Sequence, residues 1–297
     1  MRFLKLCILF FFLSFMGWSQ TKYQVVTRVI EEKHKYNDQV ISINGQNAKI
    51  NVKGAKTSQI ELTVKLIAKH PNLVLAKKAL KDMDFTQQVK SKRIYLNNYV
   101  LFKVKPDKQT IYEVIYEITV PEEAELNIKN KPGNVNLQNL KGKIEIDHQM
   151  GEVTIKDCFV DLSAKLNVGE LEIVRGEING KLVTEYVSII MRKCDGDIDL
   201  NTQFGTITMH MSKSLKNLKV KGNNTEVNII NTDCYDYNYN LTTSGGNISL
   251  NECIQDGGLI IEKQLNDIQD KKAYHIKKRP DESIINIYTK YADINIY

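Results

Sequence analysis

Residues 142–155 read Gly142-Lys-Ile-Glu-Ile-Asp-His-Gln-Met-Gly-Glu-Val-Thr-Ile155 and contain one short unit twice. Each unit is a glycine followed by four residues, of which the second and fourth are aliphatic. The unit returns along the chain, and the gaps between successive unit glycines are 9, 9, 18, 27 and 9 residues. Since every gap is a multiple of nine, a single frame runs through the whole stretch. The unit glycines are Gly133, Gly142, Gly151, Gly169, Gly196 and Gly205.

The frame also predicts which side chains face inward. Three further units lack the glycine and start at Val160, Ile178 and Val187. Across the nine units, 17 of the 18 expected inward positions are apolar, and Gly180 is the exception. A period of two inside a period of nine predicts a short strand and a turn, repeated. A helix cannot place residues i and i+2 on one face, so a helical repeat is excluded.

Strands this short can bury their apolar face only by stacking, with about 4.8 Å between neighbouring strands. Each buried aliphatic side chain then contributes about 1.5–3 kcal/mol. The sequence therefore predicts an all-β fold, a parallel β-solenoid or β-helix. Coils of two strands and about 18 residues are favoured, and coils of three strands and about 27 residues stay open.

Beyond Gly205 the frame loosens but continues to the end of the sequence. The segment 262–283 is charged and irregular, which predicts a loop or insertion between late coils. Before it, Leu218/Val220 and Val227/Ile229 are nine residues apart, and Tyr237/Tyr239, Ile248/Leu250 and Leu259/Ile261 follow at gaps of ten or eleven. After it, Ile285/Ile287 and Ile294/Ile296 are again nine apart.

The region before the repeat is predicted to be a β-rich cap over residues 20–130, followed by the solenoid over 131–297. A helix is expected over about 72–84, because Leu73, Ala76, Leu80 and Met83 fall on one face and lysines cover the other. A solenoid needs such a cap, since its end rung would otherwise be an open edge. The expected cap strands are 23–31, 39–43, 48–53, 59–69, 92–104 and 111–120.

Residues 1–19 have the pattern of a signal peptide. Arg2 and Lys5 are followed by an apolar run from Leu6 to Met16, with cleavage expected before Gln20. Later apolar runs are too short to span a membrane. The formal net charge of +6 is mild and gives no reason to expect nucleic-acid binding. We therefore expect a soluble product in the periplasm, outside the cell or at its surface.

The repeat resembles a bacterial family of envelope proteins known as putative adhesins, which share a domain of unknown function and a β-solenoid fold. The resemblance implies an exported, non-enzymatic protein, and it brings no functional residues. It rests on the units Met150-Gly-Glu-Val, Val168-Gly-Glu-Leu, Phe204-Gly-Thr-Ile and Tyr291-Ala-Asp-Ile and on the run Tyr116-Glu-Ile-Thr-Val-Pro121.

Few residues outside the repeat suggest a site. Tyr235, Tyr237 and Tyr239 form a stripe that could stack on sugar rings, although packing in the core is the favoured interpretation. Cys234 and Cys253 are about one coil apart, which permits a disulfide. Buried, unpaired cysteines at coil corners are the favoured alternative. Catalytic, cofactor and metal sites are not predicted.

The favoured function is an adhesin-like or scaffold protein that presents polar ladders to an unknown envelope protein or glycan. A first alternative is a carbohydrate-active β-helix enzyme using outward acids such as Glu170 and Glu172. A second alternative is an envelope-sensing accessory protein that acts through a membrane partner.

Overall fold

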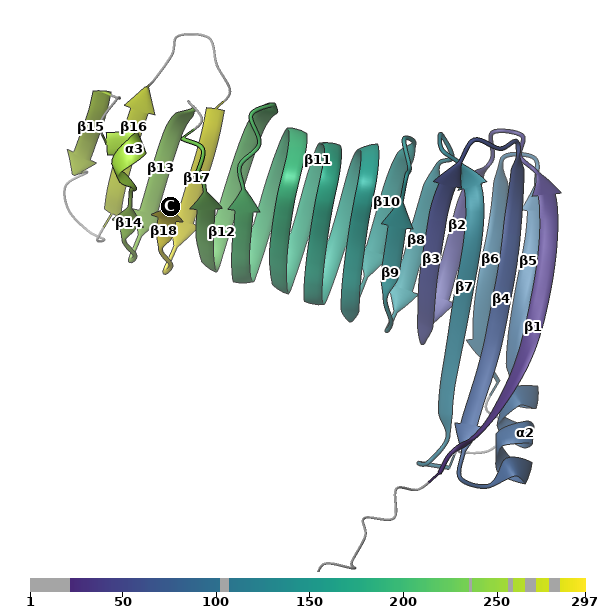
Figure 1. Ribbon diagram of the computed structural model, residues 1–297. Coiled ribbons are helices and arrows are strands. Elements are labelled where there is room, and N and C mark those ends of the chain that lie inside the picture. Colours follow the sequence, from purple (N-terminus) through teal and green to yellow (C-terminus); the bar gives the residue numbers. More distant parts are fainter. Residues whose placement is uncertain (1–21, 102–106, 235–236, 256–258, 265–270, 278–283) are drawn as a thin grey trace, which may run out of the picture.

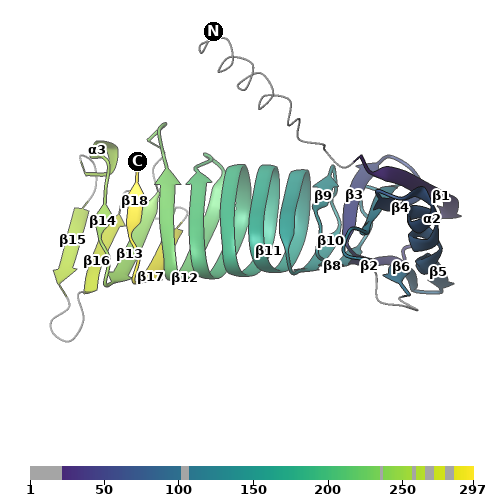
Figure 2. The same cartoon turned by 90° about the horizontal axis from the view of Figure 1, so that it is seen from below.

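The computed structural model describes residues 22–101, 107–234, 237–255, 259–264, 271–277 and 284–297 (Figure 1). The fold is all-β, with a curled sheet at one end and a solenoid-like stack of coils running away from it (Figure 2). The elements of the curled end are β1 (Gln24–Lys35), β2 (Val40–Gln46), β3 (Ala48–Ala55), β4 (Gln59–His70), α2 (Leu73–Asp82), β5 (Met83–Lys90), β6 (Arg93–Val100) and β7 (Ile111–Pro121). The coils contain β8 (Leu126–Lys131), β9 (Val135–Gln138), β10 (Lys143–His148), β11 (Gly151–His210), β12 (Leu215–Ile230), β13 (Asn238–Ser244), β14 (Ile248–Ser249), β17 (Ile284–Lys290) and β18 (Ile294–Ile296).

The pairing register gives the size of a coil. Strand β10 pairs in parallel with β8 and with β11, so Ile144 lies between Leu126 and Leu162, each of which is two repeat units away in the sequence. Strand β9 pairs with β11 at the same offset, which places Val135 opposite Val153. Each coil in this stretch therefore consists of two strands and two repeat units, and the alternative of three strands in a coil is excluded. The offset becomes slightly longer between β11 and β12.

The predicted inward aliphatic side chains form the core. All 17 of them are buried, from Val135 to Met209. The exception in the sequence pattern, Gly180, has a packing reason. A Cβ atom on Gly180 would lie 1.9 Å from the carbonyl oxygen of Leu162 in the coil before it, so the backbones approach too closely for any side chain.

Strands β2 and β3 connect the curled end to the coils. Strand β2 pairs in parallel with β6 on one side and β8 on the other, while β3 lies between β7 and β9 in the same way. The outer strands β1 and β5 each pair with one neighbour, and Arg28 on β1 donates to the carbonyl oxygen of Met83 on β5 at 2.6 Å. This contact brings the two free sheet edges together.

Helix α2 is shorter than expected and packs differently. Asn72 caps its first turn by accepting hydrogen bonds from Val74 N and Leu75 N. The helix ends at Asp82, because Met83 is already extended and begins β5, a strand that the sequence pattern did not indicate. Ala76 and Ala79 are buried against the sheet, whereas the expected contact residue Leu73 is exposed.

The C-terminal strands β17 and β18 do not stack at the end of the coils. They lie between strands that come earlier in the sequence. Strand β17 pairs in parallel with both β12 and β13, so Ile287 lies between Val220 and Leu241. The segment expected to be a loop contributes strands: β15 (Leu259–Gln264) and β16 (Lys271–Lys277) pair antiparallel with each other, and β16 also pairs with β13. The short helix α3 (Glu252–Gln255) precedes them. Residues 265–270 and 278–283 of the predicted loop lie outside the described residues.

A buried histidine makes the coil stack sensitive to acid. His148 is buried at a coil corner, where its Nε2 atom lies 2.5 Å from the carbonyl oxygen of Gly133. Burial lowers the pKa of His148 below the ordinary histidine value of about 6.5. The unfolded chain therefore binds a proton at His148 more tightly than the folded protein does. Its contribution to stability is complete above about pH 6.5 and is lost as the pH falls toward the folded-state pKa.

We expect His148→Asn to flatten the pH dependence of the unfolding free energy below neutral pH. Asparagine suits the site, because Asn130 in the preceding coil is buried at the equivalent position and donates to the carbonyl oxygen of Ala48 at 2.9 Å. Urea unfolding at a series of pH values checks this, with the exposed His275→Asn as control. An unchanged slope in His148→Asn would contradict the assignment.

Candidate functional site

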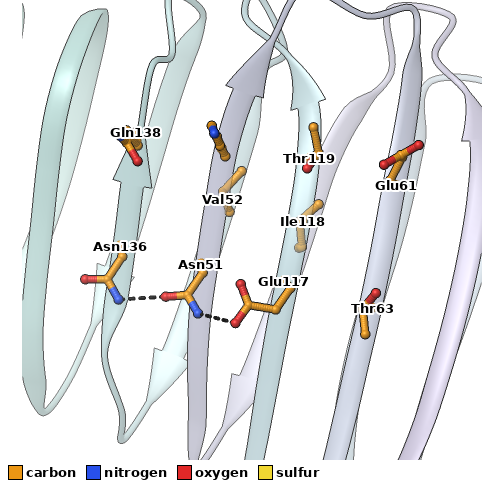
Figure 3. Close-up of a pocket in the computed structure, with 10 residues that line it drawn as sticks. Asn51, Val52, Glu61, Thr63, Glu117, Ile118, Thr119, Asn136 and Gln138 are labelled. Carbon is orange, nitrogen blue, oxygen red and sulfur yellow. Dashed lines mark hydrogen bonds between the residues drawn. The ribbon is translucent and has the colours of Figure 1, made fainter.

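A hollow on the outer surface crosses β9, β3, β7 and β4 (Figure 3). It has a volume of about 390 Å³, and we call it the β3 groove. Strand pairing aligns its outward side chains in two rows that run across the four strands. The first row is Asn136, Asn51, Glu117 and Thr63, and the second is Gln138, Lys53, Thr119 and Glu61.

The first row is held by hydrogen bonds between neighbouring strands. Asn136 Nδ2 donates to Asn51 Oδ1 at 2.7 Å, and Asn51 Nδ2 donates to Glu117 Oε1 at 2.9 Å. Each amide thus fixes the orientation of the next side chain, as Figure 3 shows. In the second row Glu61 accepts from Lys33 of β1 at 2.9 Å. The groove therefore presents a preorganised line of amide, hydroxyl and carboxylate groups.

A second groove lies on the opposite sheet of the coils, over β8, β10 and the beginning of β11. It measures about 590 Å³, and we call it the β10 groove. Asn127 Nδ2 donates to Glu145 Oε2 at 2.9 Å, which repeats the amide–carboxylate contact of the β3 groove. Lys143 also pairs with Glu145 at 2.8 Å, and this hydrogen bond holds the pKa of Glu145 below its usual value. Lys129, Lys165 and Lys181 line the same groove.

The two corners of the coils share a backbone conformation but carry different side chains. One corner has polar residues in the left-handed conformation: Asn139, Asp157, Arg175 and Lys193. The other corner carries Met150, Val168, Tyr186 and Phe204 on successive coils, and the last three of these are in the left-handed conformation. The rings of Tyr186 and Phe204 stack at 4.9 Å. Of these, Val168 is the least suited to its backbone, since its φ is 60° and its side chain is β-branched.

We expect Val168→Asn to raise the free energy of unfolding by about 1 kcal/mol, because asparagine tolerates the left-handed region better than valine. The side chain of Val168 is 43% exposed, so the change removes little packing. Urea unfolding measures the gain. The reverse change at the polar corner, Asn139→Val, should lower stability by a similar amount, and equal stability of all three proteins would contradict the strain argument.

The predicted site residues lie in different places. Tyr239 is fully buried and Tyr237 nearly so, with their rings 6.5 Å apart, so these two do not form the exposed strip considered from the sequence. They fill the core because β13 continues the inward alternation of the coils. Tyr235 lies outside the described residues.

The cysteines are partly described. Cys158 and Cys194 are buried free thiols two coils apart, and burial raises the pKa of Cys194 to about 12. Cys234 is disulfide-bonded. The side chain of Cys253 lies outside the described residues, so the pairing of Cys234 with Cys253 stays a prediction.

Glu170 and Glu172, the outward acids considered for a carbohydrate-active enzyme, differ in their contacts. Glu172 forms an ion pair with Arg192 from the next coil, whereas Glu170 is exposed. Within the described ranges, no cluster of three or more histidine, cysteine or acidic side chains could hold a metal ion. Nor does that part of the chain contain a helix long and apolar enough to cross a membrane.

Sequence reasoning missed both grooves. Asn51 and Asn136 are 85 residues apart in the sequence, and Glu117 comes from a third segment. The only signal was the strand alternation in the cap, which gives the face of each residue and not its neighbour.

The stacked coils, the curled sheet and the polar grooves define a class of solenoid-like all-β domains. Residues 39–296 match the family model described as Toastrack DUF4097, and the chain belongs to this family. This agrees with the resemblance seen in the sequence. No curated protein matches the chain.

The chain is similar to solved structures at low sequence identity. A putative adhesin from Bacteroides fragilis is 10% identical, with a TM-score of 0.50 over 91% of this chain and 97% of the other. A putative adhesin from Parabacteroides merdae has a TM-score of 0.39 at 10% identity, covering 91% and 96%. A protein from Parabacteroides distasonis described as a putative lipid binding protein has a TM-score of 0.42 at 12% identity, also covering 91% and 96%. At these identities the comparison concerns the fold alone.

Proposed function

We propose that this protein is an exported, non-enzymatic, adhesin-like or scaffold protein of the bacterial cell envelope. Its body would be a parallel β-solenoid of Gly-x-aliphatic-x-aliphatic strands. The observation that carries the proposal is the β3 groove, where hydrogen bonds from Asn136 through Asn51 to Glu117 fix a row of polar groups across three strands. Membership of the Toastrack family and the adhesin descriptions of similar structures support the envelope role.

The chemistry of the β3 groove favours an extended, hydroxyl-rich partner such as an envelope glycan. Its lining offers amide donors and acceptors, two carboxylates, two threonine hydroxyls and one lysine. These groups complement sugar hydroxyls, which both donate and accept hydrogen bonds. Because the rows run across four strands, the groove can follow a chain of several units.

Asn51→Ala tests this function with a matched control. The change removes the central amide and should lower affinity in a screen of envelope polysaccharides by about tenfold, the effect of losing one or two hydrogen bonds. Asn127→Ala removes the equivalent amide, also bonded to a glutamate, from the β10 groove. The control should bind as the wild type does. Equal affinity of all three proteins would contradict a binding role for the β3 groove.

The same screen separates binding from catalysis. A carbohydrate-active enzyme would release reducing ends or unsaturated products, and Glu170→Gln would reduce that release. Turnover of any polysaccharide would overturn the non-enzymatic proposal.

Export is tested separately by cell fractionation and by reading the N-terminus of the isolated protein with mass spectrometry, where a start at Gln20 is expected.

A further inference from the structure

Large apolar side chains gather at the end of the curled sheet where β1 and β7 begin and β4 ends. Val25, Lys69 and Ile111 lie side by side on these three strands. The first turn of α2 follows directly from β4 and lies at the same end (Figure 1). We call the exposed apolar residues here the tip surface, and they are Tyr23, Val25, Leu73, Val74, Leu75 and Ile111.

Helix α2 faces the sheet with Ala76, Ala79 and the partly buried Leu80, but its first turn leaves larger apolar residues exposed. Its buried residues are the small Ala76 and Ala79, whereas Leu73, Val74 and Leu75 face solvent. Val74 is 72% exposed, and Val25 on the adjacent strand is 57% exposed. Single exposed apolar residues are common, but six at one end of a molecule, on the helix and on the outer face of the neighbouring strands, indicate a contact surface.

Lysines surround this surface and define the charge of its partner. Lys77 and Lys78 lie one helical turn, about 6 Å, beyond the apolar turn, and Lys81 lies one turn further. Lys22 precedes Tyr23 in the chain. Within the described part of the protein none of these four lysines forms an ion pair. The nearby acids are Asp107, which faces the buried His70, Glu113, which pairs with Lys69, and Asp82 at the end of the helix.

The chain that precedes the fold also points to this end. Strand β1 begins here at Gln24, so residues 1–21 are joined to the tip surface. They contain the apolar run from Leu6 to Met16, which is long enough to enter a bilayer during export. While this segment is attached to the chain, the tip surface is the part of the fold to which it is joined.

We propose that the tip surface docks on an anionic lipid membrane. Leu73, Val74 and Leu75 would enter the boundary of the acyl chains, while Lys77 and Lys78 reach the lipid phosphates one turn higher. Long lysine side chains can follow apolar surface while their charged ends stay in the polar region, which suits this order of apolar residues below and lysines above. Docking would hold the curled sheet at the membrane and leave the coils free for the envelope partner.

Flotation with lipid vesicles tests the proposal. The protein is used in the form in which the cell leaves it, and all variants share the same N-terminus. We expect it to float with vesicles of phosphatidylglycerol and phosphatidylcholine, to stay unbound with phosphatidylcholine alone, and to dissociate in high salt. Failure to bind the anionic vesicles would overturn the proposal.

Two double variants and one control locate the contact. Lys77→Glu with Lys78→Glu, and separately Val74→Ser with Leu75→Ser, should each lower vesicle affinity by about tenfold or more. All four side chains are exposed, so circular dichroism should show an intact fold. Met150→Ser with Tyr291→Ser removes two exposed large side chains from the coils and should leave affinity unchanged. An equal loss in this control would overturn the assignment to the tip.

The test also separates membrane docking from its alternatives. Binding to native envelope membranes together with none to pure lipid would assign the tip surface to a protein partner and reject the lipid. Asn51→Ala should retain full vesicle binding, because the β3 groove lies on other residues. The two proposals can therefore fail independently.

Discussion

Gly169→Ala should lower the free energy of unfolding by about 4 kcal/mol or more, a loss that single substitutions seldom reach. Gly169 has a φ of +147°, where residues with a side chain are strained. A Cβ atom there would lie 1.9 Å from the carbonyl oxygen of Gly151 in the preceding coil. That oxygen cannot move away, because Gly151 is itself stacked closely on Gly133. The coils would have to separate locally, and the aliphatic contacts next to them would be lost.

Gly222→Ala is the control for this prediction. Gly222 is buried in β12, but the nearest atom to an added Cβ would be the Thr225 Cβ at 3.2 Å, so its neighbours would have to move much less than those of Gly169. We expect a change within about 1 kcal/mol at this site. Urea unfolding followed by circular dichroism measures both variants. Similar losses at Gly169 and Gly222 would show that glycine as such, rather than the contact between coils, sets the stability.

The core of the coils was predictable because two periods coincide in the sequence. Alternation fixes the face of a residue, and the nine-residue frame fixes its position in the coil. Val153 and Ile155 could therefore be assigned to the interior from the sequence. The length of a coil could not be assigned this way, since two repeat units and three repeat units fit the same frame. Only the pairing of Val153 with Val135 decides between them.

Other features depend on contacts that a local pattern does not contain. The β3 groove requires Asn51 to lie between Asn136 and Glu117, and this follows from the order of strands in the sheet. Strand β5 was missed because residues 83–90 come directly after the helical pattern, and no glycine or proline marks where the helix ends. The alternation shows that Tyr237 and Tyr239 lie on one face of a strand, but it does not show whether that face is buried or exposed.

The inserted C-terminal strand gives the second large effect. Ile287 of β17 is 2% exposed and lies between Val220 of β12 and Leu241 of β13. Truncation of a buried isoleucine to alanine removes its transfer energy and leaves a cavity, which together cost about 2–5 kcal/mol. We expect Ile287→Ala to fall in the upper half of this range, because aliphatic neighbours on both sides hold the cavity open.

Ile284→Ala is the matched control, since Ile284 begins the same strand and is 38% exposed. Its replacement should cost no more than about 0.5 kcal/mol. Urea midpoints of the two variants give the comparison. Equal midpoints would mean that β17 does not lie between β12 and β13.

Removal of residues 284–297 extends the same argument to the whole strand pair. The truncated chain would lose four buried isoleucines and leave the facing edges of β12 and β13 unpaired. Strand β13 would then pair only with β16. We expect the chain after Ile230 to become sensitive to proteases while the coils of β8 to β11 stay resistant, because stability in stacked coils depends on nearest neighbours. Limited proteolysis with mass spectrometry would show this as cleavage confined to residues after β12. Protection of β13 in the truncated protein would instead show that β12 and β13 can pair directly, with β17 adding a strand that the stack does not need.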